Sequence, residues 1–136
     1  MLKVEDIMNY GKHYIDEDHA NQYWWFCLAD NNVYSIDELR KTYGFINTKE
    51  IEDTGIYIPM FQTDVVALEK DFMIKNIYTE KPVYDIMEKK NIKSYDTAFR
   101  VFIETHWLRD FWYQMLNAKL KEDAVNWGKL NGVPIQ

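Results

Sequence analysis

The spacing of apolar residues changes near Thr63, and this change constrains the fold more than any other feature of the sequence. Before Thr63, apolar residues come in short runs separated by polar turns. The run from Tyr23 to Leu28 is uninterrupted and aromatic, which is typical of a strand covered on both faces. After Thr63, apolar residues recur every three or four positions, as on one face of a helix. The sequence therefore predicts an α+β fold, with strands early and helices late.

The first half of the chain predicts a small antiparallel sheet between about residues 22 and 60. A hairpin turn is expected at Asn31 and Asn32, because asparagine tolerates positive φ. The expected strands cover residues 23–28, 33–36 and 55–59.

Two helices and a loop complete this half. Apolar residues on one face of residues 3–15 predict an N-terminal helix packed against the sheet. A shorter helix is expected from Asp37 to Tyr43, where Gly44 ends it. The polar stretch 47–53 is expected to be a loop.

The second half predicts a C-terminal array of three to four helices. Thr63 or Asp64 is suited to cap the first helix, Pro82 to the first turn of the next, and Ser94 to the N-cap of a third. The last helix is expected over about residues 108–130, before a strong stop signal. Its apolar stripe consists of Trp112, Leu116, Leu120, Ala124 and Trp127.

Length and composition predict one domain over residues 1–136, because no repeat, low-complexity tract or linker interrupts the chain. The formal net charge of -6 disfavours attraction to nucleic acid or to an anionic membrane, and suits a basic protein partner better. Cys27 is the single cysteine and cannot form an internal disulfide. Together with the lack of a signal-like N-terminus and of a long apolar run, it predicts a cytoplasmic protein with no membrane span.

Seven residues of the second half carry a resemblance to a known family. They are Phe99, Trp112, Tyr113, Leu120, Ala124, Trp127 and Asn131. With Asp30 at the end of the aromatic run, and Ile58-Pro59 further on, the chain from about Tyr23 to Val133 resembles a family of small bacterial proteins catalogued as uncharacterised protein family 158. Asn31-Asn32 departs from the glycine-bearing turn of that pattern. The resemblance implies no activity, because the family has none assigned.

Two histidine–carboxylate groups are the candidates for an enzyme, either a small hydrolase or a metal-dependent one. His13 and His19 flank Asp16 and Glu17, and these are residue types that bind zinc. A solvated, acidic helix end explains the same residues and is favoured, because the spacing matches no specific ligand motif.

The second group is Glu104, His106, Arg109 and Asp110, in which a carboxylate could orient a histidine as general base. Charged clusters of this kind more often cap helices. Cys27 lies in the most apolar strand, so inert packing is favoured over a nucleophilic role. No two glycines have the spacing of a phosphate-binding loop, and no cofactor is expected.

A helix-turn-helix is a further alternative for residues 83–103. The basic residues Lys89, Lys90, Lys93 and Arg100 would then have to line one face. One arginine is few for a recognition helix, and Asp96 would repel phosphate, so an ordinary helical corner is favoured.

Aromatic residues are the most informative feature for function. The chain contains five Trp, ten Tyr and seven Phe. Many of them must fill the core, and aromatic residues are an ordinary way to fill one, but a domain of this size is expected to leave several at its surface. Tyr and Trp anchor protein interfaces because they bury a large area at low entropic cost. The preferred hypothesis is therefore a non-enzymatic protein-interaction or regulatory module, either an inhibitor or immunity-type protein or a homodimer. The candidate interaction residues are Trp24, Tyr34, Trp107 and Tyr113, with Tyr10 beside them.

Overall fold

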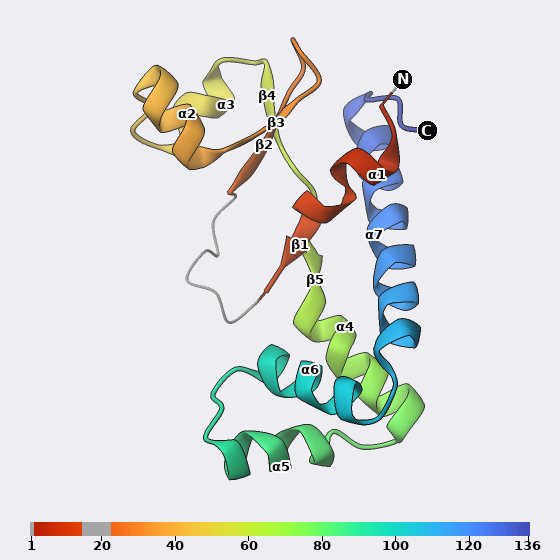
Figure 1. Ribbon diagram of the computed structural model, residues 1–136. Coiled ribbons are helices and arrows are strands. Elements are labelled where there is room, and N and C mark those ends of the chain that lie inside the picture. The colour runs from red at the N-terminus through yellow and green to blue at the C-terminus, as the bar shows by residue number, and fades with distance from the viewer. Residues whose placement is uncertain (1, 15–22) are drawn as a thin grey trace. The chain divides into compact units, whose positions relative to one another are not determined.

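The computed structural model describes residues 2–14 and 23–136, and the chain forms two compact units (Figure 1). Unit 1 comprises Met1–Gly11, Asp18–Gln62 and Lys121–Gln136, and unit 2 comprises Lys12–Glu17 and Thr63–Leu120. A small antiparallel sheet, an N-terminal helix and a set of C-terminal helices are present, which confirms the α+β class. The single domain expected over residues 1–136 remains a prediction.

The sheet of unit 1 has three antiparallel strands in the order β3-β2-β4, as the sequence predicts. They are β2 (Trp24–Cys27), β3 (Val33–Ser35) and β4 (Tyr57–Pro59). The hairpin between β2 and β3 turns at Asn31, whose φ is 59°. Trp25 and Phe26 are both buried but belong to separate apolar clusters, because successive side chains point to opposite faces. The central strand is thus covered on both sides.

The predicted N-terminal helix over residues 3–15 is much shorter than expected. Helix α1 covers Val4–Ile7, and a 3₁₀ turn, η1, covers Met8–Gly11. A Cβ atom on Gly11 would overlap the ring of Phe61, so this position requires glycine for close packing. Glycine also weakens a helix, and the next residues, Lys12–His13, form strand β1 instead. In unit 2, β1 pairs in parallel with β5 (Thr63–Asp64).

Helix α2 (Ile36–Tyr43) ends where the sequence predicts and begins one residue earlier, at Ile36, which was assigned to the preceding strand. Ser35 and Glu38 form a reciprocal capping box at its start, and Gly44 ends it with a φ of 70°.

The expected loop at residues 47–53 is wrong, because the structure has helix α3 (Thr48–Asp53) there. Asn47 caps it by accepting a hydrogen bond from the Glu50 backbone N–H at 3.1 Å. The side chain of Glu50 in turn accepts the Ile46 N–H at 3.0 Å. Ile51 is fully buried, and its side chain packs this otherwise polar helix against the core.

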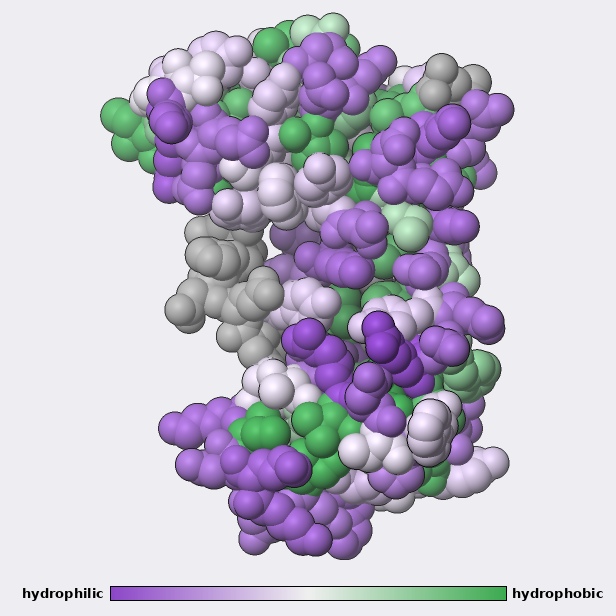
Figure 2. Space-filling model, in the orientation of Figure 1, coloured by the Kyte–Doolittle hydropathy of each residue, from purple (hydrophilic) through white to green (hydrophobic). Residues whose placement is uncertain are grey.

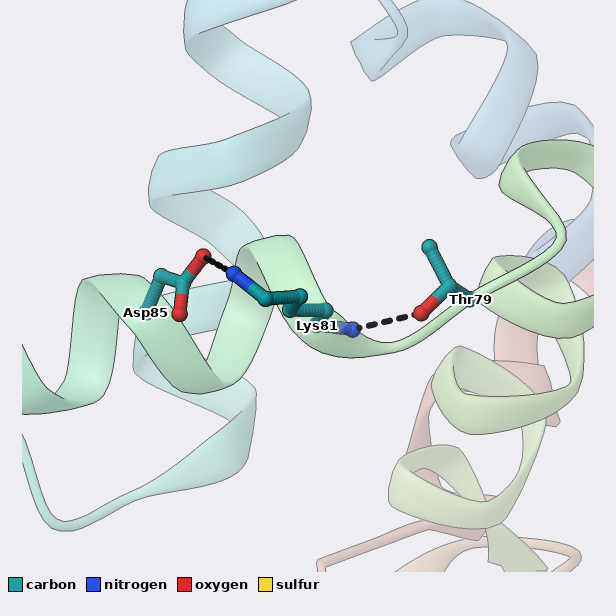
Figure 3. A network of polar contacts seen from close by, with 3 residues as sticks. All are labelled: Thr79, Lys81 and Asp85. Atoms are coloured by element: carbon teal, nitrogen blue, oxygen red, sulfur yellow. Dashed lines mark hydrogen bonds and ion pairs between the residues drawn. The ribbon is translucent and has the colours of Figure 1, made fainter.

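Unit 2 contains the helices α4 (Val65–Phe72), α5 (Lys81–Lys90), α6 (Tyr95–Thr105) and the first part of α7 (Arg109–Asn131), with a π-helical turn, η2, at Met73–Ile77. The side chains of Asp64 and Ser94 cap α4 and α6, as predicted. Before α5, the Thr79 hydroxyl accepts the Lys81 backbone N–H, and the Lys81 ammonium pairs with Asp85 one turn later (Figure 3).

The apolar stripe of α7 is buried in this chain. In unit 2, Trp112 makes edge-to-face contacts with Phe72 and Phe99, at ring-centroid distances of 5.6 and 4.8 Å. In unit 1, the Trp127 indole N–H donates a hydrogen bond to the Pro59 carbonyl at 2.9 Å. The stripe therefore forms core on this chain and is not free to bind another.

Hydrophilic side chains cover most of the face shown in Figure 2, and hydrophobic ones reach its surface in smaller areas. None of the helices in residues 2–14 and 23–136 is long and apolar enough to cross a membrane.

Candidate functional site

The four predicted interaction residues differ sharply in exposure. Trp107 is 95% exposed and Tyr113 is 36% exposed, and both belong to unit 2. Trp24 and Tyr34, in unit 1, are only partly exposed. The candidate surface is therefore the corner where Trp107 joins α6 to α7.

The other aromatic candidates are engaged within unit 1. The Trp24 ring contacts the rings of Tyr10 and Tyr23, at centroid distances of 4.7 and 4.9 Å. The Tyr34 hydroxyl donates a hydrogen bond to the Asp30 carboxylate, and this bond is the largest cause that lowers the pKa of that carboxyl. Both side chains serve the local structure around the sheet.

The backbone of the corner explains why Trp107 points to solvent. His106 is the C-cap of α6, and the Leu108 N–H donates back to the Ile103 carbonyl at 2.9 Å. This bond defines a Schellman motif, in which the residue between cap and donor adopts a left-handed conformation. That residue is Trp107, with a φ of 58°, where glycine is most common. The chain therefore has a large aromatic side chain at a position whose backbone conformation favours glycine.

A groove of about 500 Å³ lies in unit 2 between α6 and the start of α7. Its lining combines aliphatic, aromatic and charged side chains, and three of the charged residues are Arg100, Glu104 and Arg109. The described residues that line it are Thr97, Arg100, Val101, Ile103, Glu104, Arg109 and Tyr113. The groove thus gathers residues that the sequence analysis had assigned to three separate hypotheses.

The two arginines of the groove are held by different supports. Arg100 pairs with Asp96, whose side chain is largely buried, while Arg100 itself is 58% exposed. Burial is the largest single influence and lowers the pKa of the Arg100 guanidinium, but the hydrogen bond to Asp96 and the nearby negative charges together raise the pKa above its usual value. Arg109 lies over the Tyr113 ring at 5.8 Å from the centroid, and its distance to the Glu104 carboxylate is 3.5 Å. Both guanidiniums therefore have defined positions and keep donors exposed to solvent.

Glu104 and His106 have different partners, so the predicted carboxylate–histidine pair is not formed. His106 Nδ1 lies 2.9 Å from the Phe102 carbonyl, and the imidazole stacks on the Phe102 ring at 4.2 Å. The Thr105 hydroxyl lies 3.1 Å from the same nitrogen. His106 thus closes the end of α6, which is the helix-capping role that the sequence analysis favoured.

The histidine–carboxylate group near the N-terminus is only partly described. His13 lies in β1, opposite Asp64 of β5. Asp16, Glu17 and His19 lie outside the described residues. Within residues 2–14 and 23–136, no group of three His, Cys, Asp or Glu side chains is arranged to hold a metal ion. Cys27 is buried, in line with packing rather than reactivity.

The helix-turn-helix alternative requires an exposed face on α6. Four residues of α6 would face a nucleic acid in such a motif: Tyr95, Asp96, Thr97 and Arg100. Tyr95 and Asp96 are buried, whereas Thr97 and Arg100 are exposed. Lys89, Lys90 and Lys93 are exposed at the end of α5 and just after it, while Arg100 is engaged with Asp96. The first turn of α6 therefore offers little to a nucleic acid.

No protein-family model matches this sequence, and no curated protein or solved structure is significantly similar to it. The resemblance to family 158 stays a prediction. The sequence analysis had named Arg100 only for DNA binding, and it missed Thr97, Val101 and Ile103 as groove residues. The spacing of Asp96 and Arg100, one helical turn apart, was the available signal that this arginine has a fixed position.

Proposed function

We propose that this chain is a non-enzymatic protein-interaction module that docks a protein partner at the corner between α6 and α7. One observation carries the proposal: Trp107 is 95% exposed in a backbone conformation that opposes its presence. An indole in this position adds almost nothing to the core of its own chain. Tryptophan is among the residues that contribute most to binding when a partner covers them.

The surroundings of Trp107 have the composition of a small interface. Phe111, 46% exposed, rests against Phe72 at a ring distance of 5.7 Å, and Tyr113 and Val101 line the adjacent groove. Charged side chains flank these apolar groups. An apolar centre with a charged rim is the usual anatomy of a protein–protein interface.

The proposal covers two kinds of complex, and each has a distinct signature. An inhibitor or immunity-type protein binds one different chain at fixed stoichiometry. In a homodimer the chain binds a second copy of itself, so the fraction of chains in the dimer rises with the concentration of this protein alone. We also propose that the protein is cytoplasmic and that it is a member of uncharacterised protein family 158.

The test is native mass spectrometry of the protein captured gently from the lysate of its own host. Wild type is compared with Trp107→Ala and with Leu130→Ala, a matched control whose side chain is 87% exposed in unit 1. We expect a stoichiometric partner or a dimer with wild type and with the control, and loss of that complex with Trp107→Ala.

Two results would contradict the proposal. One is a bare monomer in every sample, above all one that carries a small molecule or a metal. The other is a complex that both substitutions leave intact, because the docking site then lies elsewhere.

A further inference from the structure

We draw no further inference here: the strongest candidate, the groove between α6 and the start of α7, has two arginines that are already paired with Asp96 and Glu104, and nothing that the structure describes shows what covers it.

Discussion

Replacing Trp107 should leave the free energy of unfolding almost unchanged, and replacing it with glycine should raise that free energy. The side chain is 95% exposed, so folding buries only about a twentieth of its surface. A tryptophan exposes about 250 Å² at most, and at about 25 cal/mol per Å² the buried part is worth roughly 0.3 kcal/mol. Trp107→Ala should therefore cost no more than this amount.

Glycine adds a second effect, because Trp107 has a φ of 58°. A left-handed conformation costs an ordinary residue roughly 1–2 kcal/mol, and glycine relieves that cost. Against this, the greater freedom of glycine in the unfolded chain costs roughly 0.5–1 kcal/mol. The balance predicts that Trp107→Gly is about 0.5–1 kcal/mol more stable than Trp107→Ala.

Urea unfolding followed by far-UV circular dichroism measures both values, since this signal does not depend on the substituted tryptophan. Trp112→Ala is the positive control: its side chain is buried, and we expect a loss of about 3–5 kcal/mol. A loss above about 1.5 kcal/mol for Trp107→Ala would refute the reasoning, because the indole would then be part of the core.

Three further predictions concern other parts of the chain. Tyr34→Phe should raise the pKa of Asp30, which NMR titration measures. A carboxyl whose pKa is lowered in the folded state stabilises the fold above its unfolded pKa of about 3.9, and this stabilisation is lost as the carboxyl is protonated. The variant should therefore lose less stability on acidification than the wild type does. Burial and the hydrogen bond to Glu80 raise the pKa of Tyr95 in the folded state. The free energy of unfolding should therefore fall as pH rises past the unfolded pKa of about 10, by up to about 1.4 kcal/mol per pH unit. Tyr95→Phe should remove this contribution to the pH dependence, as measured by urea unfolding at pH 9 to 11. Gly11→Ala should destabilise the chain by about 1–3 kcal/mol through overlap with Phe61, whereas an unchanged melting curve would show that the ring moves aside freely.

Most of the local structure follows from residues that are close together in the chain. Capping residues act on backbone groups two or three positions away, so Asp64 and Ser94 marked helix starts correctly. The aromatic run through Trp25 and Phe26 predicted a central strand, because apolar residues on both faces must be covered on both. Helix α3 was missed because its six residues contain one buried apolar side chain, Ile51, too few to show a period.

Which aromatic and charged residues face solvent depends on tertiary contacts that sequence patterns do not reveal. The same residue type fills a core or anchors an interface, and composition does not distinguish the two. Trp112 and Trp107 are five positions apart, yet Trp112 is buried and Trp107 is exposed. Trp107 itself adopts the left-handed conformation at which the chain leaves α6 before it enters α7. The groove likewise exists only because that corner brings Arg109 and Tyr113 of α7 beside Arg100 of α6. Side-chain exposure depends on how helices turn and pack against each other, and that is a property of contacts distant in sequence.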